Sequence, residues 1–125
     1  MRRSRVPEKA ADEVRIRCQG RCERCGISLL NRPASIHHRK PRRSGGTSDP
    51  RIHDPGNLTV LCGSGTTGCH GHIEANRQVA TEQGWLISQH DRRDPADIPV
   101  YVLTGPGEGA WIILGSDRVD LDPPF

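Results

Sequence analysis

Hydrophobic residues along the chain fall into short runs separated by charged and turn-forming segments. In "PEKAADEVRIRCQG", residues 7–20, apolar side chains recur only weakly at helical spacing. Pro7 nevertheless suits the first turn of a helix and Gly20 a C-terminal stop, so we predict a helix there. Two β-prone runs follow. "PASIHHRK" at 33–40 predicts a short strand leading into a loop, and "NLTVLC" at 57–62 predicts a second strand.

The second half of the chain predicts another helix and a hairpin. "CHGHIEANRQVATEQG" at 69–84 is typical of a helix closed by its final glycine, and "WLIS" at 85–88 of a short strand. "VYVLTGPGEGAWIIL" at 100–114 has two β-prone runs around a Gly/Pro turn, which predicts a hairpin. The tail at 120–125 is expected to be irregular. We therefore expect a single domain over 1–125, with a hairpin extension at about 98–116 packed on its core.

The composition leaves little material for that core. Of 125 residues, 33% are hydrophobic and 3% aromatic, so we expect a staple to supplement the packing. No apolar run opens the chain, and no stretch approaches the roughly 18 residues of a membrane span. We therefore expect a soluble cytoplasmic protein without a membrane partner, in which thiols stay reduced and metal is favoured over disulfides. The candidate ligands are five cysteines: Cys18, Cys22, Cys25, Cys62 and Cys69.

The cysteine spacing predicts a zinc site. Cys22 and Cys25 form a C-x2-C pair, and Cys62 and Cys69 form a second pair across "GSGTTG". That gap is longer than is usual for zinc ligands, but its glycines allow both sulfurs to converge. Such a four-cysteine site would add on the order of 10 kcal/mol to folding. A disulfide framework and inert core cysteines are the alternatives. We expect Cys18 to be a buried or idle thiol, although it could replace a ligand.

Charge is distributed unevenly along the chain. Residues 1–51 hold 14 Lys and Arg against 5 Asp and Glu, net +9, whereas residues 52–125 hold 4 against 10, net −6. The basic half predicts a polyanionic partner, with two solvated faces of opposite sign as the alternative. The densest cations follow a histidine pair in "HHRKPRR". We expect four of them to contact phosphates: Arg39, Lys40, Arg42 and Arg43.

Several further polar residues lie beside the cysteines in the sequence. They are His37, His38, Asn57, His70, His72 and Glu74. A histidine-rich cluster next to a basic loop favours a phosphodiester hydrolase, in which a divalent ion holds a phosphate oxygen and a histidine deprotonates a water. For His53 and His90 the sequence indicates no role.

The segments "CERCG", "SIHHRK", "NLTVLCG" and "GCHGHIEANR" together resemble the HNH endonuclease family over roughly residues 15–90. The chain is most similar to small bacteriophage HNH proteins that contain "LCGSGTTGCHG". The resemblance implies an α+β fold, in which a zinc-stapled ββα-metal domain carries the N-terminal helix and the C-terminal hairpin. It also implies nicking or cutting of DNA with a divalent metal such as Mg²⁺, Mn²⁺ or Ni²⁺. Phage relatives act beside the terminase during genome packaging, inside the bacterial host.

Carried over by position, the resemblance makes His38 the general base, Asn57 the residue that braces its loop, and His37 and His70 metal ligands. Several relatives have a further histidine where this chain has Glu74, which lies four residues after His70 and can reach the same ion. Neighbours in a regular strand point to opposite faces, so we expect irregular backbone at the histidine pair. His72 is expected to be exposed or to touch DNA.

Two alternatives from other classes remain open. One is a zinc-ribbon module that binds DNA without catalysis, and the other is a subunit that only licenses a terminase. The first needs the cysteines and arginines but has no use for His38, Asn57 and His70 together. Plasmid cutting in the presence and absence of EDTA separates an enzyme from both.

Overall fold

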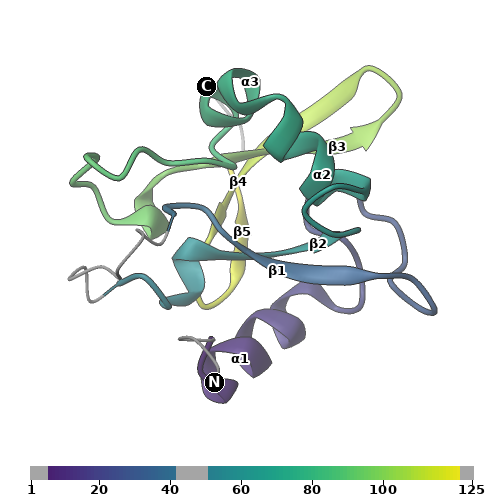
Figure 1. Ribbon diagram of the computed structural model, residues 1–125, viewed down its shortest axis with the longest axis horizontal. Helices are drawn as coiled ribbons and strands as arrows, with labels where there is room; N and C mark the ends of the chain where they lie inside the picture. The colour runs from purple at the N-terminus through teal and green to yellow at the C-terminus, as the bar shows by residue number, and fades with distance from the viewer. Residues whose placement is uncertain (1–5, 42–50, 122–125) are drawn as a thin grey trace.

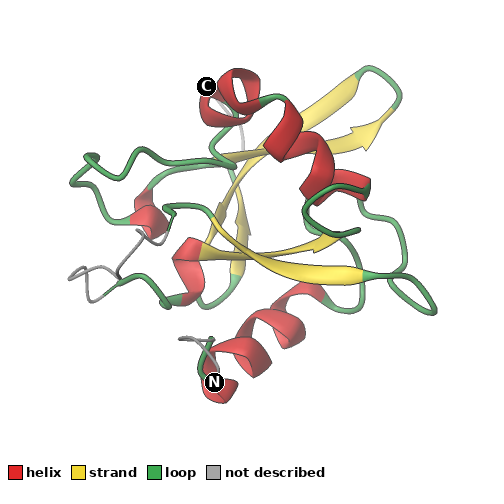
Figure 2. Cartoon of the chain, viewed as in Figure 1, coloured by secondary structure: helices red, strands yellow, loops and turns green. Residues whose placement is uncertain are grey.

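The computed structural model describes residues 6–41 and 51–121 (Figure 1). Helices, strands and two 3₁₀ turns (η) alternate along the chain, joined by long loops (Figure 2). In order, the elements are α1 (Glu8–Cys18), β1 (Ala34–His38), η1 (Pro55–Asn57), β2 (Leu58–Cys62), α2 (Gly68–Ala75), α3 (Arg77–Glu82), η2 (Pro95–Asp97), β3 (Val100–Gly105), β4 (Glu108–Leu114) and β5 (Arg118–Asp120). None of the helices in the described ranges is long and apolar enough to cross a membrane.

A two-stranded antiparallel sheet lies at the centre of the fold. β1 pairs with β2 in unbroken register from Ala34↔Cys62 to His38↔Leu58. α1 lies on one side of this pair and α2 on the other, and both helices contact β2 (Figure 1). The predicted α+β fold class is therefore confirmed, with the N-terminal helix and the C-terminal strands in their expected places.

The sparse apolar stripe of α1 is enough to pack the helix on the central sheet, because it covers only a few residues of β2. Ala10, Val14 and Arg17 are buried, at spacings that place them on one helical face. The first two of these pack against Leu58 and Val60 of β2. A larger core lies beyond β2, where α2, α3 and the C-terminal strands meet around Trp85, which is fully buried.

The single helix predicted at 69–84 is two helices, α2 and α3. Asn76 interrupts the helical backbone with φ −130° and ψ 59°. Its side-chain amide donates to the carbonyl of His72 at 2.9 Å, the same carbonyl that accepts from the Asn76 N–H at 3.0 Å, so one residue closes the last turn of α2 twice. α3 then starts again, with the N–H of Ala80 donating to the Asn76 carbonyl. After the break, Ala80 of α3 packs in the core, and the Gln83 carbonyl that follows α3 accepts from Tyr101 N–H in β3.

The predicted hairpin is present as β3 and β4, but it gains a third strand. β5 pairs antiparallel with the end of β4 through Ile112↔Asp120, Ile113↔Val119 and Leu114↔Arg118. The irregular tail that we predicted is therefore wrong at its first residue, Asp120. All three residues of β5 are exposed, so apolar patterning carried no signal for this edge strand.

The prediction of a strand at "WLIS" is also wrong. Residues 85–88 pair with no strand among the described residues, although Trp85, Leu86 and Ile87 are buried. The segment crosses the core as irregular chain that bends at Trp85 and Leu86. It is held by Ile87 N–H on the Arg39 carbonyl and by the Trp85 indole on the Tyr101 carbonyl. Its apolar character therefore reflects burial inside the core and not membership of a sheet.

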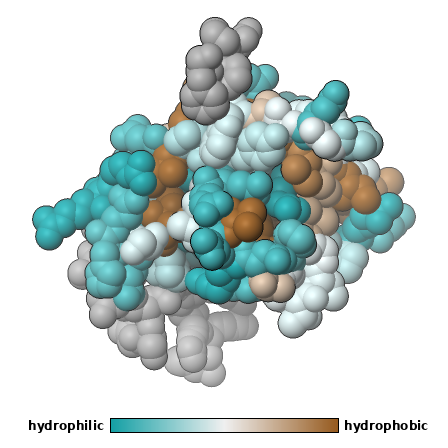
Figure 3. Space-filling model, turned by 90° about the horizontal axis from the view of Figure 1, so that it is seen from above, coloured by the Kyte–Doolittle hydropathy of each residue, from teal (hydrophilic) through white to brown (hydrophobic). Residues whose placement is uncertain are grey.

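A buried ion pair ties the first helix to the rest of the domain. The Arg17 guanidinium donates to both carboxylate oxygens of Glu23 at 2.7 and 2.8 Å, and also to the carbonyls of Pro55, Leu58 and Gly115. Glu23 in turn accepts from the N–H of Val60 in β2. These polar connections supplement the small core. On the face drawn in Figure 3, hydrophobic side chains form separate areas among hydrophilic ones.

Candidate functional site

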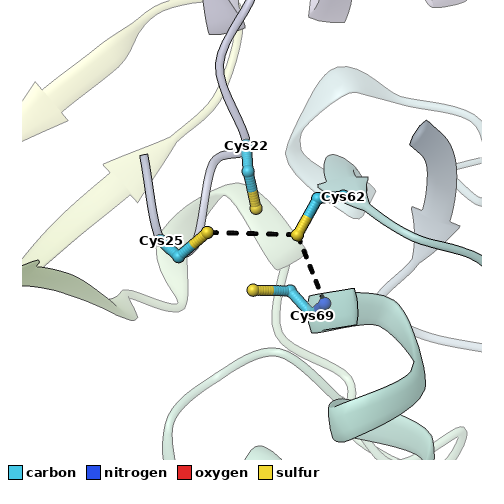
Figure 4. Close-up of side chains that lie close together, drawn as sticks. All are labelled: Cys22, Cys25, Cys62 and Cys69. Atoms are coloured by element: carbon cyan, nitrogen blue, oxygen red, sulfur yellow. Dashed lines mark hydrogen bonds between the residues drawn. The ribbon is translucent and has the colours of Figure 1, made fainter. Parts of the chain in front are cut away.

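Four cysteine sulfurs converge where the turn after α1, the end of β2 and the start of α2 meet (Figure 4). The sulfurs of Cys22, Cys25, Cys62 and Cys69 all lie within 4.8 Å of one another. Those of Cys25 and Cys62 are 3.9 Å apart. A tetrahedral ion with Zn–S bonds of about 2.3 Å requires sulfurs separated by about 3.8 Å. The four cysteines are thus positioned to form a metal site, with the donors and spacing of structural zinc.

Local backbone hydrogen bonds bring each cysteine pair together. In the first turn, Cys22 N–H donates to the Ile27 carbonyl and Gly26 N–H to the Cys22 carbonyl. In the second, the loop 63–68 folds back so tightly that a Cβ on Gly63, at φ +89°, would lie 2.0 Å from the Thr67 carbonyl oxygen. Glycine is therefore required there. It allows the second pair to close across six residues.

The surroundings of the sulfurs favour the thiolate form at Cys22, whereas they keep the proton on Cys25 and Cys69. Cys69 N–H points at the Cys62 sulfur at 3.4 Å, and Arg24 donates to the Cys69 sulfur at 3.2 Å. The pKa of Cys22 is lowered to about 4, first because Cys69 hydrogen-bonds to its sulfur. The pKa of Cys69 is raised, first because that same hydrogen bond holds its proton. Cys18 lies outside the cluster, where its thiol donates to the Arg15 carbonyl at 3.3 Å.

A second group of ligand atoms lies between β1 and α2. His37, His70 and Glu74 each offer one atom within 4.8 Å of the others. Nδ1 of His37 and Nε2 of His70 are each 3.9 Å from Oε2 of Glu74. The other carboxylate oxygen of Glu74 pairs with Arg77 at 2.5 Å. Two imidazoles and a carboxylate therefore converge, supplied by the one buried residue of β1 and by one face of α2.

Hydrogen bonds on the far side of each ring direct the two lone pairs toward Glu74. Nε2 of His37 is 2.8 Å from the Trp85 carbonyl oxygen, which can only accept, so Nε2 carries the proton and Nδ1 the lone pair. The Ser35 hydroxyl donates to the Gly63 carbonyl and therefore accepts from Nδ1 of His70 at 2.7 Å, an arrangement in which the lone pair of the neutral His70 tautomer lies on Nε2. Such outer contacts orient histidine ligands in metal sites.

Burial keeps the first of these histidines neutral. The side chain of His37 is 4% exposed, and this burial is the main reason that its pKa is lowered to about 4. The neighbouring His70 lowers the pKa further, whereas the hydrogen bond to the Trp85 carbonyl opposes the shift. At neutral pH its lone pair is therefore available. Two imidazoles and one carboxylate form a donor set that fits a divalent cation.

His38 is the last residue of β1 and lines the same depression, of about 290 Å³, as His37, His70, Glu74 and Arg77. Pairing with β2 continues through both adjacent histidines, so the irregular backbone predicted at the pair is wrong. The chain bends one residue later, at Arg39. Nε2 of His38 lies 3.2 Å from Nδ1 of His53, a residue for which the sequence indicated no role.

The buried side chain of Asn57 connects both ends of the segment between β1 and β2. Its Oδ1 accepts from Lys40 N–H at 2.7 Å, and its Nδ2 donates to the carbonyls of Lys40 and Ile52 at 3.2 and 2.9 Å. The Arg39 N–H also donates to the Asn57 carbonyl. This is the geometry that a brace for the His38 loop requires.

The predicted phosphate contacts need correction. Arg39 is fully buried, and its guanidinium donates to the carbonyls of Gly56, Gly84, Pro95 and Ile98, so it cannot reach DNA. Lys40 is almost as buried, and its ammonium group donates to the Asp91 carbonyl at 2.9 Å. Arg42 and Arg43 lie outside the described residues. Of the remaining histidines, His72 is exposed on α2 and His90 is exposed beyond α3.

Comparison with known proteins accords with this geometry. Residues 22–76 match the family model described as HNH endonuclease, within the core predicted at 15–90. Searches of curated proteins and of solved structures found no match. The matched range contains all four clustered cysteines, the triad of His37, His70 and Glu74, and both His38 and Asn57. The resemblance seen in the sequence is thus confirmed for the family over residues 22–76, which match an HNH endonuclease domain.

Proposed function

We propose that this protein is a metal-dependent endonuclease that hydrolyses phosphodiester bonds in DNA. The observation that carries the proposal is the convergence of Nδ1 of His37, Nε2 of His70 and Oε2 of Glu74 in a depression that His38 also lines. A divalent cation held by these three atoms supplies a Lewis acid that stabilises negative charge on phosphate oxygens. A carboxylate among the ligands favours Mg²⁺ or Mn²⁺, and two imidazoles also suit Ni²⁺.

In this proposal the residues around the cation have separate tasks. His38 accepts a proton from water, the water oxygen bonds to phosphorus, and one P–O ester bond breaks as its oxygen leaves and takes a proton from solvent. Asn57 holds the loop that follows His38, so that the imidazole keeps its position. Arg77 lines the depression and can offer a guanidinium N–H to a phosphate oxygen when the Glu74 carboxylate turns to the cation.

The four-cysteine site serves the fold in this proposal. Four thiolate ligands leave no open position for a substrate, which is the arrangement of structural zinc. Zinc there would connect the turn after α1 to β2 and to the first turn of α2, the helix that carries His70 and Glu74. It would thereby hold one wall of the depression in place.

DNA is the proposed substrate, and the basic N-terminal half of the chain would contact its backbone. Because Arg39 and most of Lys40 are enclosed, this task falls to Arg42 and Arg43 together with Arg77. A phage origin and a terminase partner rest on the sequence resemblance in the segment "LCGSGTTGCHG". Co-purification with a terminase subunit tests that part of the proposal separately.

Cleavage of supercoiled plasmid by the zinc-loaded protein tests the activity. We expect cutting with Mg²⁺, Mn²⁺ or Ni²⁺ and its loss in EDTA. His38→Ala should keep its affinity for the catalytic cation, measured by calorimetry, yet cut roughly 10²–10⁴-fold more slowly. His70→Ala should lose that affinity, and excess cation should restore part of the rate. His90→Ala, which changes an exposed histidine elsewhere, is the control.

Two results would overturn this assignment. If His38→Ala loses the cation while His70→Ala retains it, the two roles are reversed. If the parent binds DNA but cuts with none of the three metals, a non-catalytic DNA-binding module explains the chain better.

A further inference from the structure

His53 lies against the proposed base although 15 residues separate it from His38. The two rings are in edge contact, with centroids 5.2 Å apart and planes inclined by 64°. Nε2 of His38 and Nδ1 of His53 face one another at 3.2 Å, which is within hydrogen-bond distance. Two ring nitrogens at this separation share one proton, so whichever nitrogen donates, the tautomer of one ring is coupled to that of the other.

Buried contacts hold this ring pair together. The turn that carries His53 is closed by Asp54 N–H on the Arg51 carbonyl at 3.0 Å. Asn57 binds the carbonyl of Ile52, immediately before His53, and also binds Lys40, two residues after His38. A single buried amide therefore fixes the backbone beside both histidines. The contact between the two rings is therefore positioned by backbone hydrogen bonds of the folded domain.

We propose that His53 is a positioning residue that fixes the tautomer and orientation of His38. In this arrangement Nε2 of His38 carries the proton and donates it to Nδ1 of His53. The lone pair of His38 then lies on Nδ1, the nitrogen that accepts a proton from water. After that transfer the His38 imidazolium keeps its Nε2–H bond to neutral His53. The inference deepens the proposed function, because it concerns the base of that same site.

The ring nitrogens themselves give the first test. Histidine labelled with ¹⁵N is incorporated into zinc-loaded protein without the catalytic cation, and spectra are recorded at about pH 8, above the ordinary histidine pKa of about 6.5. Loss of signals in His38→Ala assigns the ring. We expect the Nε2–H tautomer of His38 in the parent and in His53→Asn, whose Oδ1 can stand where Nδ1 stood. His53→Leu should show a mixture of tautomers, and His90→Leu should match the parent.

The cutting rate gives the second test. We expect His53→Leu to lower the single-turnover rate about 10–100-fold, by analogy with the loss of an outer partner from a metal-ligating histidine. DNA affinity and cation affinity should stay at the parent values, and His53→Asn should recover most of the rate. In the His38→Ala background, His53→Leu should have no further effect, because the two residues act as a unit.

These outcomes separate failure of the inference from failure of the proposed function. A parent that cuts no DNA refutes the function, while the ¹⁵N spectra still report the His38 tautomer. The inference is refuted if His38 is Nδ1-protonated in the parent or if its tautomer is unchanged in His53→Leu. It is refuted as well if His53→Leu slows cutting equally with and without His38, since that result indicates a general effect on the fold.

Discussion

Replacing Arg39 with methionine distinguishes a cation that supports the fold from one that grips DNA. Methionine retains much of the arginine stem but offers no donor. In the structure the guanidinium donates to four carbonyl oxygens at 2.7–2.9 Å, those of Gly56, Gly84, Pro95 and Ile98. These carbonyls belong to η1, to the turn that follows α3, to the first residue of η2 and to the residue after η2. Arg39 thus joins three segments that share no sheet.

The loss of stability follows from those four contacts. Each buried carbonyl left without a donor costs about 1–3 kcal/mol. Part of this loss is offset, because the folded methionine variant no longer has the free-energy cost of removing a guanidinium charge from water. Burial, and after it the charge of Arg17, lowers the pKa of Arg39 to about 9. The guanidinium therefore remains charged at neutral pH. We therefore expect Arg39→Met to lose about 4 kcal/mol, a large share of the 5–15 kcal/mol typical of a domain.

Urea unfolding of zinc-loaded protein, followed by tryptophan fluorescence, measures that loss. Arg15→Met is the matched control, because Arg15 is exposed on α1 and the same atoms are removed. We expect the control to stay within about 0.5 kcal/mol of the parent. Under conditions in which Arg39→Met remains folded, the slope of log K for DNA against log salt should equal that of the parent.

The opposite pattern would refute this reasoning. If Arg39→Met is as stable as Arg15→Met, and its salt slope falls by about one, the guanidinium binds a phosphate. Arg39→Lys refines the comparison. A single ammonium cannot reach four carbonyls arranged around a planar fork, so its stability should lie between those of the parent and of Arg39→Met.

Two further predictions concern the metal ligands. Cys22→Ser should lose zinc and fail to fold, whereas Cys18→Ser should keep about one zinc per chain by elemental analysis; a folded, zinc-loaded Cys22→Ser would contradict the four-cysteine site. The pKa of His37 is about 4 in the folded chain, against its ordinary value of 6.5. Between pH 6.5 and pH 4 this histidine therefore gains a proton mainly in the unfolded chain, and the free energy of unfolding decreases as the pH falls. The loss should total about 3 kcal/mol. His37→Gln, which can still donate to the Trp85 carbonyl, should lack this loss in urea unfolding at pH 7 and pH 4, and equal losses in both proteins would contradict it.

Local patterns in the sequence predicted most of the elements around the site. Pro7 and Gly20 delimited the first helix, and β-prone runs located both strands of the central pair as well as the hairpin. The cysteine spacing and the glycines of loop 63–68 predicted the sulfur cluster, because ligand spacing and backbone freedom are properties of a short segment. The order of histidines and asparagine likewise indicated the family.

Long-range contacts decided the rest. The sequence does not distinguish Arg39 from the cations around it, and carbonyls 17 to 59 residues away make Arg39 part of the core. The apolar segment "WLIS" is compatible with a strand and with irregular chain that crosses the core. Residues distant in the chain determine which of these structures forms. His53 meets His38 where Asn57 hydrogen-bonds to the backbone beside both residues. The sequence by itself determined which chemical groups and local elements are present, whereas burial and pairing depend on partners that only the folded chain brings together.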